Sequence, residues 1–374
     1  MVSRHTFART TTTHSPTIPP PALVRAVETV RTGLQRVRAR MAPPFAGVLD
    51  LAMGYAVSHA VQAAARLAIA DVFDDGPLSV ERIAERIDAD AHAVRRLLRV
   101  LASHQIFRER RDGRFEMTPM SHALRSDAPV SIRPLLMMIS HPFYTEHFAR
   151  LPDVVRTGRT SVESTYGAGL FDCLEQDPDA AAVFNDAMTC VTAMAVPPVL
   201  AAYDFTDAET IVDVGGGAGQ LLAAVLNAAP QARGVLFEQS SLKDHAQRVF
   251  ESAGVADRAT IETGSFFEAV PEGGDIYLLK HVVHDWDDRQ AAAILATVRE
   301  SMSPNARLLL AETVIPSGNR PHFGKLLDLD MLVFAGGRER TAPEFTDLLT
   351  GSGFTPPRII PTAIHLSLLE AVPN

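Results

Sequence analysis

The chain contains 374 residues, a length that suits two domains plus a tail better than one minimal core. Apolar residues make up 47% of it and charged residues 21%, so its composition is globular and excludes disorder throughout. A formal net charge of −9 argues against nucleic acid as the main partner, because neutralising phosphates requires a basic surface. Its two cysteines, Cys173 and Cys190, are too few for a disulfide framework or a cysteine-built zinc site, which favours a reducing cytoplasm.

The first 45 residues are rich in threonine and proline and carry seven arginines against one acidic residue, Glu28. They lack the apolar core of a signal peptide, and no uncharged apolar run has the roughly 18 residues that a membrane-spanning helix requires. We therefore expect a cytoplasmic protein with no membrane partner, whose residues 1–45 form a flexible or loosely helical tail. An arginine-rich transit peptide is the alternative interpretation of this segment.

Residues 46–205 show apolar side chains at three- and four-residue spacing, which predicts a mostly helical domain. Within it the sequence predicts a helix, a second helix and a two-stranded hairpin turned at Asp112–Gly113. This is the order of elements in a winged helix. The three predicted elements cover residues 77–87, 88–106 and 107–118.

The second of these predicted helices places Arg95 and Arg99 on its outer face, with no acidic residue expected nearby. A helix that reads DNA has this pattern. The alternative is a packing or dimerisation module whose arginines are solvated, and the acidic net charge of the chain favours that alternative.

Residues 206–374 alternate short β-branched runs with helical segments, which predicts a parallel sheet covered by helices on both faces. Two apolar runs separated by a short turn close the chain and add two final strands. The predicted strands are TIVDV (210–214), GVLFE (234–238), ATIET (259–263), DIYLLK (275–280), ARLLLAET (306–313) and two within 356–372.

A glycine-rich turn, IVDVGGGAGQL at 211–221, lies between a predicted strand and a predicted helix. Its glycines let the backbone approach a ligand without obstruction by a Cβ atom. Glu238 ends the next predicted strand, where its carboxylate can hold two ribose hydroxyls. Together these features predict an adenosine-containing ligand, and an ordinary turn between strand and helix is the alternative.

The segment KHVVHDWDD at 280–288 follows a later strand, at the edge where open α/β sheets place their ligands. With AET at 311–313 and GGRERT at 336–341, it resembles the small-molecule O-methyltransferases of the plant caffeic acid and bacterial hydroxyneurosporene type. The resemblance covers nearly all of the chain after residue 45. It implies a class I methyltransferase fold of the α/β class, Rossmann-like with a seven-stranded sheet, and the cofactor S-adenosylmethionine. It also implies a homodimer in which the helical domain closes the partner's active site.

The resemblance identifies His284 as the general base that removes the proton from the acceptor hydroxyl. Glu312 and Glu339 flank this base, while Asp285 orients the base or the substrate, or caps the following helix. The chemistry itself is independent of the resemblance, since a free phenol ionises near pH ~10 and a neutral imidazole within hydrogen-bond reach takes its proton. No metal is required. The spacing of His281 and His284 leaves a metal site as the alternative.

The resemblance also assigns the residues that bind S-adenosylmethionine, whose product would be S-adenosylhomocysteine (SAH). Glu238 takes the ribose, while Ser265 and Phe266 take the adenine edge. At two positions the chain departs from the family pattern, with Glu238 where aspartate is common and Ser265 in place of an aspartate. Glutamate conserves the charge and serine does not, so weaker adenine anchoring or an altered cofactor pose stays open. The other cofactor residues are Asp213, Gly215, Gly217, Lys280 and Thr192.

Four apolar residues are candidates for holding a flat acceptor ring. The segment FNDAMTCVTAM at 184–194 matches a family helix that lines the acceptor pocket, and a second predicted helix precedes GGRERT. Plain core packing is the alternative for each candidate, because methionine and aromatic residues at helical spacing usually lie in the core. The candidates are Phe184, Met188, Met331 and Phe334.

Two other functions fit parts of the sequence. Some relatives with the same fold and cofactor hydroxylate or decarboxylate a polyketide, but the intact His284, Glu312 and Glu339 favour methyl transfer. A transcriptional regulator would bind DNA with its winged helix, and the acidic net charge argues against it. We therefore predict an O-methyltransferase of secondary metabolism that acts on a small, aromatic acceptor and has no nucleic-acid partner. The sequence does not identify the acceptor.

Overall fold

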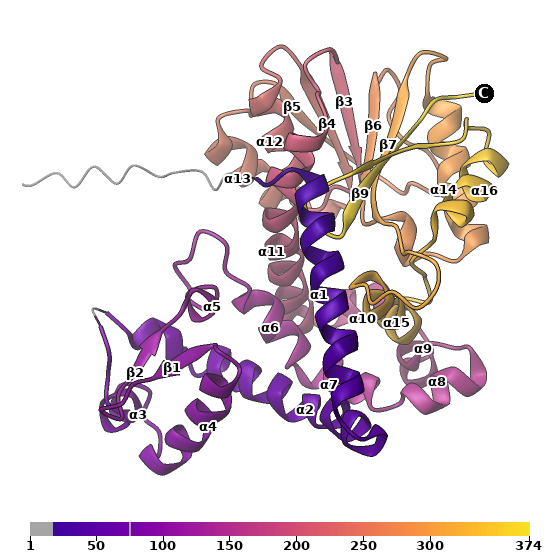
Figure 1. Ribbon diagram of the computed structural model, residues 1–374. Helices are drawn as coiled ribbons and strands as arrows, with labels where there is room; N and C mark the ends of the chain where they lie inside the picture. Colours follow the sequence, from indigo (N-terminus) through magenta and orange to yellow (C-terminus); the bar gives the residue numbers. More distant parts are fainter. Residues whose placement is uncertain (1–17, 75) are drawn as a thin grey trace, which may run out of the picture.

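The computed structural model describes residues 18–74 and 76–374, which form a helical half and a half built on a seven-stranded sheet (Figure 1). Two long helices begin the described chain, α1 (Pro21–Met41) and α2 (Pro44–Arg66). Each has a proline in its first turn, where the missing N–H group costs no hydrogen bond. Figure 1 shows α1 running along the front of the molecule from the sheet-containing half to the helical half.

The predicted flexible tail is a regular helix over part of its length. Residues 1–17 of the predicted tail lie outside the described residues, whereas Pro21–Met41 form α1. This helix turns a polar side toward the protein, since Thr32 is 8% exposed, while Leu23 and Val30 on its other side are 55% and 63% exposed. The composition suggested a tail because arginines separate the apolar positions and obscure their helical spacing.

A helix, a second helix and a hairpin follow in the predicted order. The side chains of Ser79 and Asp90 cap the two helices by accepting hydrogen bonds from backbone N–H groups. Gly113, with φ +78°, supplies the left-handed residue of the hairpin turn. After the 3₁₀ helix η1 (Ile69–Val72), these elements are α3 (Val80–Arg86), α4 (Ala91–Ser103), β1 (Phe107–Glu109) and β2 (Phe115–Met117).

Arg95 on α4 is not isolated from acids, so that part of the sequence interpretation is wrong. Its guanidinium lies 3.4 Å from Oε1 of Glu81 on α3. Glu81 precedes α4 by ten residues, and the approach of the two helices brings the side chains together. Arg99 is exposed on the same helix. One of the two charges on which the DNA-reading interpretation rested is therefore paired within the chain.

The rest of the helical half consists of short helices and one long one, α11. By length and composition α11 could cross a membrane. In the structure it packs against α6 and against α12 (Gln220–Ala228), and its residues Ala195 and Val199 lie in the core. These helices are α5 (Pro119–His122), α6 (Arg133–Ile139), α7 (Pro142–Phe148), α8 (Leu151–Thr157), α9 (Ser161–Tyr166), α10 (Leu170–Gln176) and α11 (Pro178–Ala202).

The large sheet has the strand order β5-β4-β3-β6-β7-β9-β8. Strands β3 to β7 are parallel, and β9 inserts antiparallel between β7 and β8, as the predicted closing strands require. All seven predicted strands are confirmed. They are β3 (Thr210–Val214), β4 (Arg233–Glu238), β5 (Ala259–Thr263), β6 (Ile276–Lys280), β7 (Arg307–Thr313), β8 (Arg358–Pro361) and β9 (Leu366–Ala371).

Helices cover both faces of this sheet, as Figure 1 shows. Alternate residues of one strand enter different cores: Ile211 packs with α11, α12 and α13, whereas Val212 packs with α14 and α16. The described residues thus form the three layers of a doubly wound α/β domain. The elements are α12 (Gln220–Ala228), η2 (Ser240–Leu242), α13 (Lys243–Ala253), η3 (Val283–Asp285), α14 (Asp288–Ser301), α15 (Gly324–Phe334) and α16 (Ala342–Gly351).

Candidate active site

The turn that carries His284 follows β6 at the carboxyl edge of the sheet. β6 ends at Lys280, and His281 adopts a left-handed backbone conformation, φ +53°, that leads the chain out of the strand. A non-glycine residue in this conformation is uncommon, and such positions gather at functional sites. The chain then forms the short helix η3, which contains His284.

Three carboxylates surround the imidazole of His284. Its Nδ1 atom lies 2.8 Å from Oε1 of Glu339 and 4.0 Å from Oε2 of Glu312. Its Nε2 atom lies 3.5 Å from Oδ1 of Asp285. His284, Glu312 and Glu339 are buried, whereas the Asp285 side chain keeps 21% of its surface exposed. The structure thus brings together the four residues that the sequence proposed as the catalytic group.

Glu312 reaches this cluster from β7. Its Oε1 atom accepts hydrogen bonds from the backbone N–H groups of Val282 at 3.1 Å and Val283 at 2.9 Å. Its Oε2 atom has no hydrogen-bond partner among the described residues and lies on the side of His284. The same carboxylate therefore holds the turn in place and adds negative charge beside the imidazole.

Glu339 comes from the loop 336–341 between α15 and α16. Its N–H group donates to Oδ1 of Asp328 on α15 at 2.9 Å. Two residues earlier, Gly337 lies so close to η3 that a Cβ atom there would clash with the carbonyl oxygen of His284. This carbonyl also accepts a hydrogen bond from the N–H group of Arg338 at 2.8 Å. The loop thus packs directly against the turn that carries His284.

The carboxylates raise the proton affinity of the imidazole. Burial alone would lower the pKa of His284, but the charges of Asp285, Glu312 and Glu339 outweigh burial and raise it to about 10. Burial raises the pKa of Glu312 to about 7, although the nearby His284 cation opposes this. Burial also raises the pKa of Asp285. The cluster can therefore accept a proton from a weakly acidic hydroxyl.

Asp285 does not cap the helix that follows it, so this one of its proposed roles is wrong. The N-cap of α14 is Asp287, whose Oδ1 atom accepts a hydrogen bond from the N–H group of Gln290 at 2.7 Å. Asp285 instead lies beside Nε2 of His284, within η3. Of the alternatives stated for this residue, orienting the base or the substrate is the one that its place in the structure supports.

The glycine-rich turn between β3 and α12 has the open backbone that its sequence predicted. Gly215, Gly217 and Gly219 have φ angles of +68°, +61° and +74°, which glycine adopts without strain. Glu238 lies across this turn, and its Oε2 atom accepts a hydrogen bond from the N–H group of Gly217 at 2.9 Å. Its Oε1 atom accepts another from Gln239 at 2.9 Å. Each oxygen keeps a second lone pair for a ligand hydroxyl.

Asp213 is a buried carboxylate beneath the same turn. It is 1% exposed, and neither of its oxygens has a hydrogen-bond partner within the described part of the chain. A Cβ atom on Gly216 would clash with one of these oxygens. Burial raises the pKa of Asp213 to about 7, against the opposing charge of Lys280. A buried acid without partners at a ligand edge is a group that a bound polar molecule can satisfy.

Three more predicted cofactor residues lie in two places, apart from Lys280 at the end of β6. Ser265 and Phe266 follow β5, and the Phe266 ring meets the Trp286 ring edge to face at 6.0 Å, which puts this segment beside the His284 turn. Thr192 lies on α11, where its hydroxyl donates to the carbonyl of Met188 at 2.9 Å within the same helix. Thr192 is therefore engaged by its own helix in this structure.

The four acceptor candidates are not equivalent in the structure. On α11, the Phe184 ring lies 6.4 Å from Phe171, which in turn stacks on Trp286 at 6.1 Å. Phe334 is 5% exposed and stacks on Tyr144 at 4.4 Å, in an aromatic cluster with α7. Met188 and Met331 are half-buried. Phe184 is thus connected through aromatic contacts to the His284 turn, whereas Phe334 lies in a packed core, as the alternative interpretation expects.

The cluster around His284 also has the spacing of a metal site. His284, Glu312 and Glu339 offer ligand atoms that lie within 4.8 Å of one another. The Nδ1 atom of His284 is hydrogen-bonded to Glu339, so a metal on that atom would have to replace this bond. His281 is not part of this group; its ring stacks on His284 with centroids 5.0 Å apart. The i, i+3 histidine pair therefore does not form the predicted alternative metal site among the described residues.

Comparison with known proteins decides the family. The O-methyltransferase domain matches residues 148–355, and the O-methyltransferase dimerisation domain matches residues 49–127. The chain belongs to the small-molecule O-methyltransferase family. Phenazine O-methyltransferase PhzM from Lysobacter antibioticus is 40% identical over 336 residues, which cover 90% of this chain and 98% of that protein.

Two further similarities show the range of this family. Aclacinomycin 10-hydroxylase RdmB from Streptomyces purpurascens is 34% identical over 301 residues, which cover 79% of this chain and 80% of that protein. The crystal structure of CalO1, a methyltransferase in calicheamicin biosynthesis in its SAH-bound form, matches with a TM-score of 0.80 and 33% identity. That match covers 89% of this chain and all of that one. The chain is thus an S-adenosylmethionine-dependent O-methyltransferase with the class I fold.

The residues at the carboxyl edge of β3 and β4 fit this cofactor. The glycine turn leaves space for a ligand against its backbone, and the buried oxygens of Asp213 lack partners among the described residues. Glu238 presents its carboxylate across the turn. These groups suit an adenosyl amino acid, which carries ribose hydroxyls and an ammonium group.

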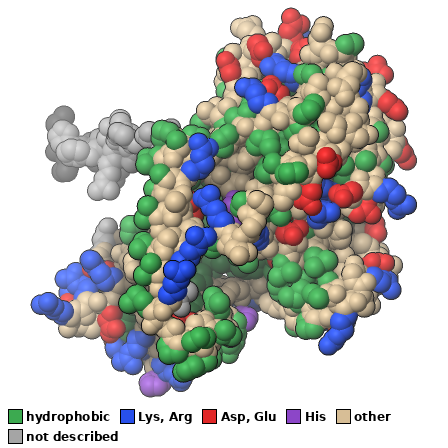
Figure 2. Space-filling model, turned by 45° about the vertical axis from the view of Figure 1, so that its right-hand side comes forward, with side chains coloured by type: hydrophobic (Ala, Val, Ile, Leu, Met, Phe, Trp, Pro, Cys, Tyr) green, Lys and Arg blue, Asp and Glu red, His purple; other side chains and the backbone are tan. Residues whose placement is uncertain are grey.

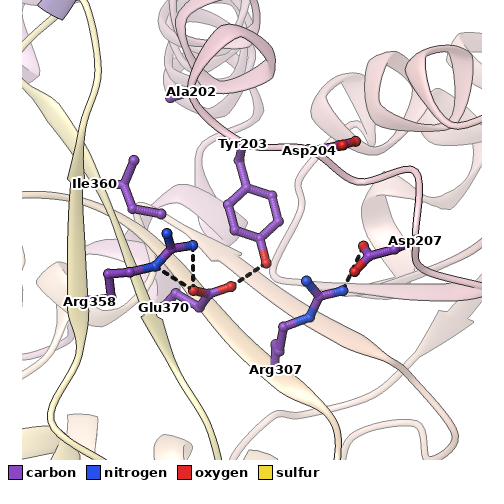
Figure 3. Close-up of a pocket in the computed structure, with 8 residues that line it drawn as sticks. All are labelled: Ala202, Tyr203, Asp204, Asp207, Arg307, Arg358, Ile360 and Glu370. Atoms are coloured by element: carbon purple, nitrogen blue, oxygen red, sulfur yellow. Dashed lines mark hydrogen bonds and ion pairs between the residues drawn. The ribbon is translucent and has the colours of Figure 1, made fainter.

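A pocket of about 400 Å³ at the opposite edge of the sheet is separate from this site (Figure 3). It includes Arg307, the first residue of β7, whereas Glu312 lies near the end of that strand. Its charged groups pair with one another: Tyr203 donates to Glu370 at 2.6 Å, and Arg307 lies 2.8 Å from Asp207. These pairs leave no reason to assign the pocket a part in methyl transfer.

Several residues that build the site were not predicted from the sequence. Gly337 and Arg340 lie in the quoted GGRERT motif, but their contacts with η3 depend on a fold that brings residues 283–288 and 336–341 together. Asp328 holds Glu339 from α15. A glycine pair before the glutamate was the available signal, because a close backbone approach requires glycine.

Proposed function

We propose that this enzyme transfers a methyl group to a hydroxyl oxygen of an aromatic acceptor, with His284 as general base. The observation that carries this proposal is the 2.8 Å contact between Nδ1 of His284 and Oε1 of Glu339. If Nδ1 carries the proton that is donated to this carboxylate, Nε2 is left with a lone pair for the acceptor hydroxyl. Asp285, beside Nε2, then orients the base or the acceptor.

The carboxylates raise the proton affinity of the base. The charges of Asp285, Glu312 and Glu339 raise the pKa of His284 above that of a free imidazole, which brings it closer to that of a phenol, which ionises near pH ~10. The smaller difference in pKa makes proton transfer from the acceptor hydroxyl to the imidazole less unfavourable. The carboxylates of Glu312 and Glu339 stabilise the imidazolium that results.

S-adenosylmethionine, when bound, supplies a methyl group that is already activated by the positive charge on the adjacent sulfur. We assign its ribose to Glu238 and its amino-acid end to Asp213, Gly215 and Gly217. Ser265 and Phe266 take the adenine, with support from Lys280 and Thr192. Burial lowers the pKa of Lys280, and Asp213 opposes this, so the two buried groups are electrostatically coupled.

We assign the acceptor ring to Phe184, Met188 and Met331, with Phe334 behind them in the aromatic cluster. Aromatic and thioether side chains pack on a flat ring without fixing its substituents. The route from Phe184 through Phe171 to Trp286 supports this placement, because Trp286 is two residues from His284. The acceptor would be a product of secondary metabolism.

We further propose that the enzyme is a cytoplasmic homodimer. Support comes from the apolar stripe on the outer side of α1, which recurs at intervals of four and three residues, and from exposed apolar residues on α2. Figure 2 shows apolar side chains beside arginines along α1. Exposed stripes of this extent mark interaction surfaces. The residues are Leu23, Val27, Val30, Leu34, Val37 and Met41 on α1, with Phe45, Leu49 and Leu51 on α2.

Light scattering after size exclusion tests the dimer, and it is expected to give twice the mass of the chain. The double variant Val30→Glu and Leu34→Glu should weaken association, whereas Gln35→Glu, an exposed neighbour outside the stripe, should not. A monomer in the wild type would reject the proposal. The division of the chain into an N-terminal segment 1–45, which contains α1, a dimerisation domain with a winged helix over 46–205 and a cofactor domain over 206–374 also stays a proposal.

The reaction is tested with a methyl-labelled donor and a panel of phenolic acceptors, analysed by mass spectrometry. Methyl transfer predicts one labelled methyl group in the product and SAH as coproduct. The same fold supports the hydroxylation named for the relative from Streptomyces purpurascens. An oxygen-dependent product without the labelled methyl group would therefore favour that reaction instead, and it would reject methyl transfer.

A further inference from the structure

Arg340 is a charged side chain that is completely buried next to the proposed base. Its exposed fraction is 0%. Its guanidinium donates to the carbonyl oxygen of Val283 at 3.0 Å, to that of Trp286 at 2.9 Å and to Oδ1 of Asp288 at 2.9 Å. Val283 and Trp286 belong to the turn that carries His284, and Asp288 is the first residue of α14.

Val283 and Trp286, whose carbonyl oxygens accept these bonds, lie one residue before and two residues after His284. η3 has three residues, too few for a regular hydrogen-bond ladder to fix its geometry. The turn is instead held from two sides. The carboxylate of Glu312 accepts from its N–H groups, and the guanidinium of Arg340 donates to its carbonyl groups.

The backbone of Arg340 also links the other two parts of the cluster. The N–H group of Ile315 donates to the carbonyl oxygen of Arg340 at 3.0 Å, and Val314 forms an isolated parallel bridge with Arg340. Val314 follows β7 two residues after Glu312, while Arg340 directly follows Glu339. One residue therefore connects the segments that supply the base and both flanking glutamates.

A buried guanidinium is costly to desolvate unless its donors are bonded, so its presence here requires a compensating role. Its carboxylate partner among the described residues, Asp288, has 60% of its side chain exposed, which limits the strength of that ion pair. The planar fork of donors reaches the carbonyl oxygens of Val283, Trp286 and, at 3.3 Å, Arg338, together with the carboxylate of Asp288. A lysine ammonium is a compact charge and cannot reproduce this fork.

We propose that Arg340 is a positioning residue that holds the η3 turn so that Nε2 of His284 is directed at the acceptor hydroxyl. The inference rests on the proposed role of His284 as general base. It predicts that changing Arg340 lowers the rate of methyl transfer while the cofactor site, built from β3 and β4, stays intact. A purely structural role would instead lower stability and cofactor binding together.

The test uses Arg340→Lys and Arg340→Ala in the full chain, with Arg258→Lys as matched control. The Arg258 guanidinium likewise donates to backbone carbonyls, those of Ala232 at 2.8 Å and Leu226 at 3.1 Å, but on the α12 side of the sheet. For each variant one measures kcat and KM with an acceptor found in the screen, SAH affinity by calorimetry, and the melting temperature.

We expect Arg340→Lys to lower kcat by about tenfold or more, because small misplacements of a reacting group have effects of that size. SAH affinity and KM should stay within a few-fold of wild type, and millimolar guanidinium should restore part of the activity of Arg340→Ala. Arg258→Lys should keep the wild-type kcat. If Arg340→Lys matches that control in kcat, or loses SAH binding in proportion to kcat, the positioning role is rejected.

Two parallel variants keep the result interpretable. Asp288→Asn removes the negative charge that pairs with the guanidinium of Arg340. It should lower kcat, but less than Arg340→Lys does, and it still tests the proposal if the Arg340 variants fold poorly. An unchanged kcat in Asp288→Asn with unfolded Arg340 variants counts against positioning. His284→Ala separates the two proposals: if it retains full activity, the proposed base is wrong, whatever Arg340 does.

Discussion

The Nδ1 atom of His284 and the Oε1 atom of Glu339 lie 2.8 Å apart, although 55 residues separate them along the chain. Both side chains are buried, so this contact is not weakened by competition with water. It fixes which nitrogen of the imidazole faces the protein. The opposite nitrogen is then the one that can meet an acceptor.

His284→Ala removes the proposed base and should lower kcat by about a hundredfold or more, the effect expected for loss of a general base. SAH affinity should change little, because the glycine turn and Glu238 are separate from the imidazole. Steady-state kinetics and calorimetry measure the two quantities. Loss of SAH binding in this variant would mean that the His284 turn belongs to the cofactor site.

Glu339→Gln should move the pH dependence of kcat/KM toward lower pH. The proposed base acts when deprotonated, so kcat/KM should rise with pH up to the pKa of His284, which the surrounding carboxylates raise. Removing one of the negative charges that raise this pKa should lower it, by about one to three units. Glutamine still accepts the hydrogen bond from Nδ1. Glu344→Gln, a change in the cap of α16, is the control and should leave the rising limb in place.

Glu238→Ala should weaken SAH binding by about tenfold or more, since hydrogen bonds to a charged group contribute about 1.5–3 kcal/mol each. Glu262→Ala, an exposed glutamate on the neighbouring strand β5, provides the comparison and should bind normally. Calorimetric titration with SAH gives both dissociation constants. Equal affinity in the two variants would show that the ribose is held elsewhere.

Gly337→Ala should damage both stability and catalysis, because its Cβ atom would clash with the carbonyl oxygen of His284. Overpacking of this kind costs about 1–3 kcal/mol. Gly351→Ala at the end of α16 is the matched change, since its Cβ would meet nothing within 4 Å. The melting temperature and kcat should both fall in Gly337→Ala and should stay at the wild-type values in Gly351→Ala. If Gly337→Ala is active and stable, the loop 336–341 can shift to accommodate the Cβ atom, and its close fit to η3 is not required.

The sequence predicted the features that depend on local patterns. The strands of the sheet and the glycine turn follow from β-branched runs and glycine spacing, and His284 and its glutamates follow from motifs. What it missed depends on contacts between distant segments. Composition could not show that Glu81 meets Arg95, that Asp287 and not Asp285 caps α14, or that Arg340 holds η3. The apolar stripe of α1 was not recognised because arginines stand between its apolar positions.

The two halves of the active site come from different stretches of chain. The glycine turn, Asp213 and Glu238 lie within 213–238, on two adjacent parallel strands. The proposed base His284 is held by a loop, 336–341, that lies between α15 and α16 and contacts the turn after β6. A transient opening that releases this loop would therefore leave a molecule that still binds its methyl donor. In that state Glu339 no longer orients the proposed base, so the acceptor hydroxyl cannot be deprotonated. Hydrogen exchange in the loop would report on how often the enzyme visits that loaded, inactive state.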